Sequence, residues 1–337
     1  MQTLKVGFVG CGLHATRDLF PSLSKVNNIR LIATCDLNVK KAKKNASKFG
    51  ADSYYSDYKE MISMENLDAI IISGPPDMHY KVGLFCLQNG LHIFVEKPSS
   101  ISLDNAKELS VKSKKHNVFG QVGHFLRYSS AHQLAKEIIS SKNFGKPVSI
   151  NCHYYTNSPW ETRWDIKDLE WTYMVVQGVH LIDICRFFMG EVSEVQAMKN
   201  LSGNNRLSFV SNFRFKNNSI GSLTFSSSAA HWSSFVEIIS DTFSKLTIVN
   251  GMKLIYEKSK SWTEKFNFDK VGSRQIYDGG ISYNSKSEFG YYGQFHHFSN
   301  YILENKEPSP SLYDHYKTLK VADLIIKSCT LNKALHF

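Results

Sequence analysis

The sequence predicts an α/β protein of two domains: a doubly wound parallel sheet over residues 1–124, then an α/β domain over residues 125–337. Three observations support this prediction. The length of 337 residues corresponds to about two domains at roughly 150 residues each. Short β-branched runs alternate with helix-length segments over the first 124 residues, which is typical of parallel β-α-β units. Beyond residue 124, runs with a hydrophobic period of two indicate antiparallel strands.

In the first domain, hydrophobic periodicity predicts strands and helices in alternation. The predicted strands cover residues 4–9, 29–35, 54–55, 69–73, 91–95 and 118–122. The predicted helices cover residues 15–26, 39–49, 77–89 and 103–116. Gly50 and Gly90 stand where helix C-caps are expected, and Ser100 or Ser102 stands where the next helix begins.

The second domain mixes helices with short alternating strands. Helices are predicted over residues 130–140, 172–189, 288–304 and 313–329, and a first strand over residues 147–155. Period-two alternation predicts further antiparallel strands at residues 208–215, 219–226, 234–240 and 246–249. Residues 258–287 are polar and weakly patterned, so we expect a long loop there.

Composition excludes several classes of protein. Hydrophobic residues make up 42% and charged residues 21% of the chain, close to the average of globular proteins, which excludes disordered and fibrous folds. Polar residues interrupt the longest apolar stretch, at residues 173–190, so no membrane span is predicted. The sequence starts without a secretion signal, and its six scattered cysteines include no C-x-x-C pair. We therefore expect a cytoplasmic protein with reduced thiols and no membrane association.

The net charge of +10 raises the question of anionic partners. Lysines gather on predicted helix faces such as residues 40–48 and 112–115, where contact with solvent is the expected role. No helix-turn-helix, zinc-finger or RNP pattern accompanies the charge, so no nucleic-acid binding is predicted. A phosphate-bearing small substrate is compatible with the charge.

A G-x-G-x-x-A motif, Gly10-Cys11-Gly12-Leu13-His14-Ala15, joins the first predicted strand to the first helix. In such a motif Gly10 permits the tight turn, Gly12 lets the backbone approach a pyrophosphate, and Ala15 allows close helix–strand packing. Asp36 follows the second strand, where a carboxylate accepts hydrogen bonds from an adenosine ribose and repels a 2′-phosphate. The sequence therefore favours NAD(H), with residues 10–15 and Asp36 in the cofactor site. NADP(H) is the alternative because Lys40 and Lys41 follow closely.

Further segments resemble one protein family. They are Ile70-Ile-Ile-Ser-Gly-Pro-Pro-Asp-Met-His79, His92-Ile-Phe-Val-Glu96-Lys97-Pro98, and residues 122–127, 144–148, 178–183 and 308–320. With the N-terminal motif, they make the sequence similar to the Gfo/Idh/MocA family of glucose-fructose oxidoreductase, inositol dehydrogenase and rhizopine-catabolism proteins. The resemblance covers nearly the whole chain, and the E-K-P tripeptide is its most specific element.

The resemblance implies an N-terminal Rossmann domain and a C-terminal substrate-binding and oligomerisation domain with a large, mainly antiparallel sheet. It also implies a homodimer or homotetramer paired through that sheet, and an NAD-dependent dehydrogenase or reductase acting on CH–OH groups. Lys97 would be the proton carrier at the substrate carbinol, and it would also contact the cofactor. Pro75, His79 and Glu96 would be further cofactor-binding residues.

The chemistry of hydride transfer agrees with this role for Lys97. An alcohol oxidised by nicotinamide must lose its hydroxyl proton, and a ketone reduced by it must gain one. Desolvation at a strand end lowers the pKa of a lysine towards neutrality, which suits it to this proton transfer.

The predicted helix over residues 172–189 carries the second set of candidate residues. The family has D-x-G-x-H here, and its histidine corresponds to His180, whereas its aspartate corresponds to Val176. We expect His180 to act in the site, with Tyr173 or Gln177 supplying the hydrogen bond that the aspartate would give. The absent carboxylate weakens assignment as a plain polyol dehydrogenase. Asp183 and Arg186 are expected to form an i, i+3 structural pair.

Other candidates have less specific signals. Arg127 is a candidate for binding a substrate hydroxyl or phosphate, and Tyr154 and Trp164 for stacking on a sugar, with core or dimer packing as the alternative for each. The pair His296-His297 and Cys329 show no metal-ligand spacing, so no metal site is predicted.

Together these features predict an NAD(H)-dependent oxidoreductase that transfers hydride at a secondary alcohol or ketone of a sugar or nucleotide-linked sugar. One alternative is a glycosidase that retains NAD and uses transient oxidation to drive elimination. Another is a non-catalytic regulator gated by a dinucleotide. The presence of Lys97 and His180 argues against the regulator, which needs no proton carrier.

Overall fold

The computed structural model describes residues 2–259, 273–279 and 289–337, and it divides into two compact units. Unit 1 comprises Met1–Phe125 and Gly290–Lys317, and unit 2 comprises Leu126–Phe289 and Thr318–Phe337. The sequence analysis assigned every residue after 124 to the second domain, whereas the structure groups Gly290–Lys317 with unit 1. The chain therefore returns to the first unit near its end, which hydrophobic periodicity alone does not reveal.

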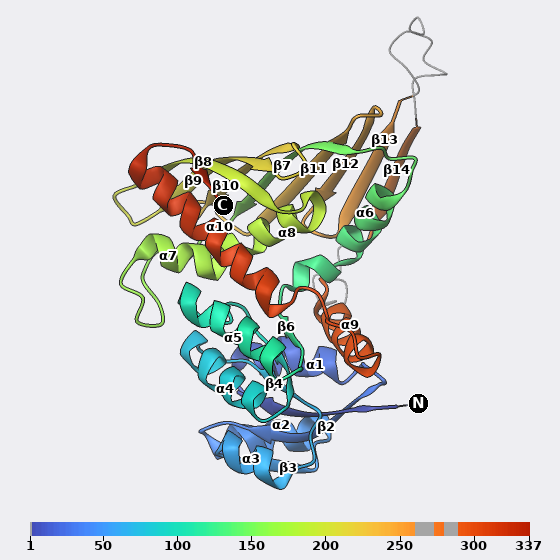
Figure 1. Cartoon of the computed structure of the whole chain (residues 1–337), viewed down its shortest axis with the longest axis vertical. Coiled ribbons are helices and arrows are strands. Elements are labelled where there is room, and N and C mark those ends of the chain that lie inside the picture. The colour runs from blue at the N-terminus through green and yellow to red at the C-terminus, as the bar shows by residue number, and fades with distance from the viewer. Residues whose placement is uncertain (1, 260–272, 280–288) are drawn as a thin grey trace, which may run out of the picture. The chain divides into compact units, whose positions relative to one another are not determined.

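Unit 1 is built on a six-stranded parallel sheet in the order β3-β2-β1-β4-β5-β6 (Figure 1). The strands are β1 (Leu4–Val9), β2 (Ile29–Cys35), β3 (Ser53–Tyr55), β4 (Ala69–Ile72), β5 (His92–Val95) and β6 (Gly120–Val122). This is the doubly wound order of a dinucleotide-binding domain, in which the chain reverses direction across the sheet between β1 and β4. The predicted parallel sheet is confirmed.

The helices of unit 1 follow the predicted segments with two differences. They are α1 (Phe20–Leu23), α2 (Val39–Phe49), α3 (Tyr58–Met64), α4 (Pro76–Gln88), α5 (Leu103–Lys115) and α9 (Tyr291–Leu303). A π-helical turn, Ala15–Leu19, precedes α1, and the seven-residue α3 was not predicted because it is too short to show a clear period. Gly50 caps α2 in the left-handed conformation and Ser102 caps α5, as expected.

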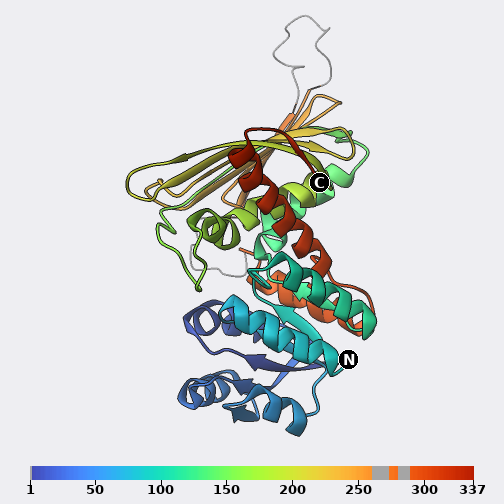
Figure 2. The same cartoon turned by 60° about the vertical axis from the view of Figure 1, so that its left-hand side comes forward.

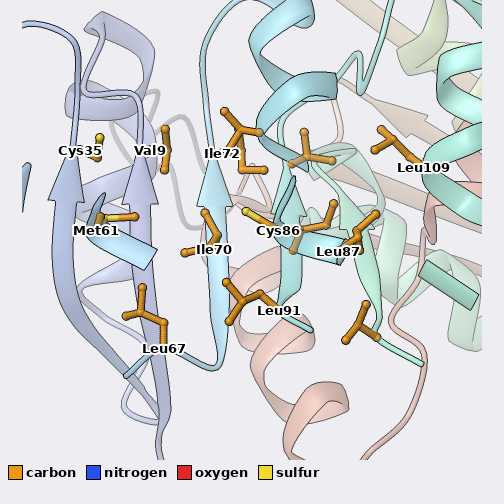
Figure 3. Packing of buried hydrophobic residues seen from close by; sticks show 14 of the residues in the cluster. Val9, Cys35, Met61, Leu67, Ile70, Ile72, Cys86, Leu87, Leu91 and Leu109 are labelled. Atoms are coloured by element: carbon orange, nitrogen blue, oxygen red, sulfur yellow. The ribbon is translucent and has the colours of Figure 1, made fainter. Parts of the chain in front are cut away.

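Alternating side chains of the parallel strands fill two cores. On one face, Val9, Ile70 and Ile72 pack with Met61 from α3 and with residues of α4 and α5 (Figure 3). On the other face, Phe8 stacks on Phe20 of α1. Phe94 likewise contacts Phe295 and Phe298 of α9, which explains why the segment from Gly290 belongs to this unit. Because both faces are covered, the strand ends are the accessible edges of the sheet.

Unit 2 is built on a nine-stranded sheet in the order β14-β13-β12-β11-β7-β10-β9-β8-β15. Its strands are β7 (Pro147–Tyr155), β8 (Val192–Leu201), β9 (Leu207–Phe215), β10 (Ile220–Ser226), β11 (Ser233–Ser240), β12 (Ser244–Val249), β13 (Lys253–Lys258), β14 (Ser273–Asp278) and β15 (Leu335–His336). The pairing is antiparallel except between β7 and β10, which are parallel. The predicted mainly antiparallel sheet is confirmed. β14 corrects part of the predicted loop at 258–287, and residues 260–272 and 280–287 of that loop lie outside the described residues.

Helices line one face of this sheet. They are α6 (Ser130–Ser140), α7 (Leu169–Tyr173), α8 (Val179–Met189) and the later turns of α10 (Leu312–Leu331), and a π-helical turn, Met174–Gly178, joins α7 to α8. Figures 1 and 2 show α6, α8 and α10 beside the same face, and no helix of the described part of the chain covers the opposite face. The strict alternation of buried and exposed residues along β9 records this one-sided burial.

Two further predictions concern the whole chain. All six cysteines are free, and five of them are buried, as expected for core thiols. Among the helices that the structure describes, none combines the length and the apolar character needed to cross a membrane.

Candidate active site

The loop after β1 has the geometry that the G-x-G-x-x-A motif predicts. Gly10 has φ +98°, and a Cβ added there would lie 1.8 Å from the carbonyl oxygen of Ser73, so only glycine fits this turn. A Cβ added at Gly12 would meet nothing within 4 Å, which leaves the backbone open to a ligand. Ala15 is buried against the sheet, whereas the side chain of Leu13 is 78% exposed. The loop therefore offers exposed backbone where a pyrophosphate is expected.

Asp36 organises the neighbouring edge of the site. Its carboxylate accepts the backbone N–H of Cys11 at 2.8 Å and that of Asn38 at 2.8 Å. These bonds hold the loop after β1 against the end of β2. A carboxylate has about four acceptor positions, so Asp36 retains capacity for ribose hydroxyls.

A cavity of about 430 Å³ opens along these strand ends. Loops after β1, β2 and β4 line it, including the predicted residues Gly10, Gly12, Asp36 and Pro75. Its volume lies within the usual range of cofactor pockets. The chain thus has both the glycine turn and the space that a dinucleotide needs.

Sequence reasoning missed several side chains of this cavity, among them Tyr58, Met78 and Lys81. Tyr58 belongs to the unpredicted α3, and burial raises the pKa of its hydroxyl. Lys81 lies 2.7 Å from Asp77, an i, i+4 pair on α4 that brings a carboxylate beside this cation. Lys40 and Lys41, which left NADP(H) open in the sequence, are not among the residues that line the cavity.

Beside Ala15, His14 joins the cofactor loop to the end of β5. Its Nδ1 lies 2.9 Å from Asp18, and its Nε2 lies 3.8 Å from Oε1 of the buried Glu96. Burial opposes the charged ring, but hydrogen bonding and attraction from Glu96 and Asp18 outweigh it and raise the pKa of His14. Tyr291 of α9 contacts the ring edge-on. The two carboxylates therefore favour the charged form of the His14 ring beside Glu96.

Lys97 follows Glu96 directly at the carboxyl end of β5. Its backbone N–H donates to Glu96 Oε2 at 3.2 Å. A Cβ added at Gly123 would lie 2.7 Å from Glu96 Oε1, so a larger residue in the segment after β6 would displace this carboxylate. In a parallel sheet, the carboxyl ends of neighbouring strands form one edge. Unit 1 thus brings Lys97 and Glu96 to the edge that carries the glycine loop.

His79 differs from its expected role as a cofactor contact. It is 1% exposed, and both ring nitrogens are engaged by the backbone, Nε2 with the N–H of Gly74 and Nδ1 with the carbonyl oxygen of Pro98. Burial lowers its pKa to about 4. The structure therefore assigns His79 to a bridge between two loops, and its neighbour Pro75 contributes to the cavity.

In unit 2, His180 belongs to an aromatic cluster. It is 4% exposed on α8, and its ring lies 5.8 Å from the ring of Tyr154 on β7, nearly parallel to it. Trp232 contacts Tyr154 edge-on at 6.1 Å. The sequence analysis did not identify Trp232 as a candidate, because it lies just before the alternating run that predicts a strand at residues 234–240. The structure thus brings His180 and Tyr154 together, and their roles in a substrate site stay predictions.

Tyr173 is a correction. Its side chain is fully buried and stacks on Phe209 of β9, and burial raises the pKa of its hydroxyl far above the ordinary value. This core position does not suit a proton carrier. Gln177, the other candidate partner for His180, is half-buried within the π-helical turn, and Val176 is 7% exposed.

Arg127 is a second correction. Its guanidinium forms a two-pronged ion pair with the Asp183 carboxylate, with N–O distances of 2.6 and 2.7 Å, and both side chains are buried. Arg186 contacts Glu191 and the hydroxyl of Thr318, and the predicted Asp183–Arg186 pair stays a prediction. Arg127 therefore anchors α8. Because its guanidinium is engaged by Asp183, it is not positioned as a ligand of the substrate.

The remaining candidates are quickly placed. Trp164 is 37% exposed, with φ 56°, in the irregular segment between β7 and α7. Within the residues that the structure describes, no three His, Cys, Asp or Glu side chains are grouped to hold a metal ion.

Fold and cofactor cradle together define a protein with a dinucleotide-binding unit followed by a sheet-based second unit. Residues 4–124 match the model of an oxidoreductase family with an NAD-binding Rossmann fold, and residues 132–243 match the Gfo/Idh/MocA C-terminal domain. The chain belongs to the Gfo/Idh/MocA family, and unit 1 is its NAD-binding domain.

Relatives and solved structures agree with this family. The chain is 25% identical over 192 residues to inositol 2-dehydrogenase of Salmonella paratyphi B, a match covering 56% of each protein, so it spans little more than half of that relative. It is 23% identical over 331 residues to inositol 2-dehydrogenase/D-chiro-inositol 3-dehydrogenase of Lactiplantibacillus plantarum, covering 96% of this chain and 90% of that protein. A dehydrogenase structure from Chromobacterium violaceum has a TM-score of 0.91 at 21% identity, covering 98% and 97% of the two chains.

Proposed function

We propose that this protein is an NAD(H)-dependent oxidoreductase that interconverts a secondary alcohol and a ketone on a sugar or nucleotide-linked sugar. The observation that carries the proposal is the edge of the unit 1 sheet, where the glycine loop and Asp36 line a cavity of cofactor size and the Glu96-Lys97 pair follows β5 at the same edge. The nicotinamide, when bound, supplies the hydride acceptor or donor. The protein must then supply the proton transfer and hold the substrate.

Lys97 is the proposed proton carrier. It takes the hydroxyl proton of the alcohol during oxidation and returns a proton to the carbonyl oxygen during reduction. Tyr173 and Arg127 are buried in structural contacts, which leaves Lys97 and His180 as the principal polar candidates of the predicted set. His180 donates or accepts one hydrogen bond at the substrate oxygen and so contributes orientation.

A sugar-like substrate fits the surroundings of His180. Tyr154 presents its ring beside His180 and Trp232 contacts Tyr154 edge-on, and such rings pack against the C–H faces of sugars. The named relatives act on inositols, which are ring polyols. Val176 lies where the family has an aspartate, and the chain carries a net charge of +10, so we favour a nucleotide-linked sugar over a neutral polyol.

The open face of the unit 2 sheet is the proposed subunit interface. Apolar Val210 and Ile220 are exposed on this face. Three of the polar residues beside them are Asn151, Asn212 and Arg214, which with Ile220 line a shallow cavity of about 300 Å³. Pairing of two sheets in a homodimer or homotetramer would cover these residues. Light scattering of the purified protein measures its molar mass and therefore its oligomeric state.

The function is tested with a panel of nucleotide sugars, aldoses and polyols, each mixed with the protein and either NAD⁺ or NADH. We expect at least one substrate to change the NADH absorbance in step with product formation. The Lys97→Met variant should lose this activity. Lys107 is an exposed lysine on α5, so Lys107→Met is the matched control and should retain the activity.

Other outcomes separate the rival functions. Release of a free sugar without net NADH production would identify an NAD-retaining glycosidase. Cofactor binding without turnover of any panel member, combined with ligand-dependent binding to DNA, would identify a regulator. Either result overturns the proposed dehydrogenase activity.

A further inference from the structure

Two buried histidines contact the backbone immediately after Lys97. His79 on α4 and His315 on α10 are at most 1% exposed. His79 Nδ1 lies 2.8 Å from the carbonyl oxygen of Pro98, and His315 Nε2 accepts the N–H of Ser99 at 3.2 Å. Proline has no N–H, so the His315 bond engages the first backbone donor after Lys97.

The hydrogen-bond partners of His79 determine where its proton lies. Nε2 accepts the N–H of Gly74 at 2.8 Å, so the ring proton is on Nδ1, which donates to the carbonyl oxygen of Pro98. An acceptor and a donor on one neutral ring therefore each face a complementary backbone group. A doubly protonated ring would place an N–H against the N–H of Gly74.

These two partners belong to different functional loops. Gly74 lines the cofactor cavity in the loop after β4, next to Pro75. Pro98 lies in the turn after β5, next to Lys97. His79 consequently joins the loop that meets the cofactor to the turn that presents the amine.

His315 holds the same turn from another direction. Because its Nε2 accepts from Ser99, its proton is on Nδ1, which faces His124 Nε2 at 2.8 Å. His124 follows β6 and is 1% exposed. The pair of rings thereby ties the turn after β5 to the segment after β6 within unit 1.

We propose that His79 and His315 are positioning residues that fix the Lys97 turn, and that His79 separately anchors the cofactor loop through Gly74. The inference deepens the proposed function and rests on Lys97 as the proton carrier. The histidines act through the backbone and do not exchange protons with the substrate. A displacement of about 1 Å at a reacting group can cost about 100-fold in rate, so a loosened turn lowers kcat.

Two substitutions at position 79 separate its two hydrogen bonds. The amide nitrogen of asparagine occupies about the place of Nδ1, and the amide oxygen of glutamine occupies about the place of Nε2. His79→Asn therefore keeps the bond to Pro98 and loses the bond to Gly74. His79→Gln keeps the bond to Gly74 and loses the bond to Pro98.

The two variants should have opposite effects. We expect His79→Gln to lower kcat by about 10-fold to 100-fold while the Kd of NADH, from fluorescence titration, changes by less than about 3-fold. We expect His79→Asn to raise the Kd of NADH by about 5-fold to 10-fold while kcat changes by less than about 3-fold. A merely structural histidine would not produce this split.

Amide hydrogen exchange on the protein without added cofactor gives a second readout. His79→Asn should accelerate exchange at Gly74. His315→Asn removes the acceptor for the N–H of Ser99, so amide exchange at Ser99 should accelerate and kcat should fall. His315→Gln retains that acceptor, so the exchange rate at Ser99 and kcat should both stay close to the wild-type values. The His315 pair also carries the test if a position 79 variant does not fold.

Several results would overturn the proposal. If the two position 79 variants changed kcat and Kd equally, His79 would be structural only. If the two position 315 variants had equal kcat, the same would hold for His315. The proposed function fails separately, if Lys97→Met retains wild-type turnover. In that case the claim that the histidines position Lys97 is also overturned, although exchange at Gly74 and Ser99 still reports the hydrogen bonds.

Discussion

At the scale of single residues, Val176 determines what can be expected of His180. A neighbouring carboxylate would orient the imidazole and increase its basicity, whereas valine supplies neither effect. The ring of His180 instead packs beside Tyr154, which orients it through contact. This contrast supports the proposal that Lys97 transfers the proton and that His180 orients the substrate.

This division of roles predicts unequal effects of two substitutions. Lys97→Met keeps much of the side-chain stem but removes the proton carrier, so turnover should fall by about 10²-fold to 10⁴-fold with little change in NADH affinity. His180→Ala removes only positioning, so turnover should fall by about 10-fold to 10²-fold. Steady-state kinetics with one substrate measure both variants. Equal losses would show that His180 carries the proton.

Asp36 predicts the choice of cofactor. Its carboxylate would gain a ribose hydrogen bond with NADH and would repel the 2′-phosphate of NADPH, so NADH should bind at least about 10-fold more tightly, or ~1.4 kcal/mol. Asp36→Asn retains an acceptor for the N–H of Cys11 while removing the charge, and should reduce this preference. Fluorescence titrations with both cofactors provide the measurement. Tighter binding of NADPH by the wild-type protein contradicts the assignment.

Residue roles were predictable where the local backbone determines them. Gly10, Gly12 and Asp36 occupy the expected places because a strand, a turn and a helix in sequence suffice to position them. The role of His79 was not predictable, because its partners Gly74 and Pro98 meet only in the folded sheet. Hydrogen-bond partners distant in sequence leave no local pattern.

At the scale of elements, two π-helical turns explain where helix periodicity misled. Ala15–Leu19 and Met174–Gly178 each begin a predicted helix, one beside the cofactor loop and the other before His180. A π-helical turn uses i→i+5 hydrogen bonds, so residues beyond it are rotated from the faces that a regular helix predicts. Tyr173, expected beside His180, accordingly packs against Phe209. π-helical turns frequently occur at functional sites.

The Arg127–Asp183 pair predicts a large effect on stability. The two side chains are 8% and 1% exposed, so Arg127→Met would leave a buried carboxylate without its guanidinium and should cost about 3–5 kcal/mol of unfolding free energy. Arg30 and Asp52 form a matched exposed pair, at 62% and 54% exposure, and Arg30→Met should cost at most about 1 kcal/mol. Urea unfolding compares the variants. Similar costs for the two pairs would contradict the structural role of Arg127.

At the scale of the whole molecule, the fold class was predictable and the division of the chain was not. Parallel and antiparallel sheets differ in hydrophobic period, and this difference is present in the sequence. The return of Gly290–Lys317 to unit 1 depends on Phe295 and Phe298 packing against Phe94, some 200 residues earlier in the chain. Such a contact is visible only after folding.

Each unit also contains a buried neutral histidine, which predicts sensitivity to acid. Burial lowers the pKa of His79 in unit 1 and of His132 in unit 2 to about 4, against 6.5 for an ordinary histidine. As pH falls from 6.5 towards 4, the unfolded chain takes up protons at these positions and the folded chain does not. The free energy of unfolding therefore decreases with falling pH, by about 2 kcal/mol per histidine at pH 5.

Amide hydrogen exchange at pH 7 and pH 5, corrected for the intrinsic exchange rate, measures this loss in each unit separately. His132→Gln removes one titrating group, so the pH dependence of unit 2 should become shallower by up to one proton while that of unit 1 is unchanged. His116, half-buried at the end of α5, provides the control, because His116→Gln leaves both buried histidines in place. An unchanged pH dependence of unit 2 in His132→Gln would mean that His132 does not hold its low pKa. Acid sensitivity would then have to arise from other groups.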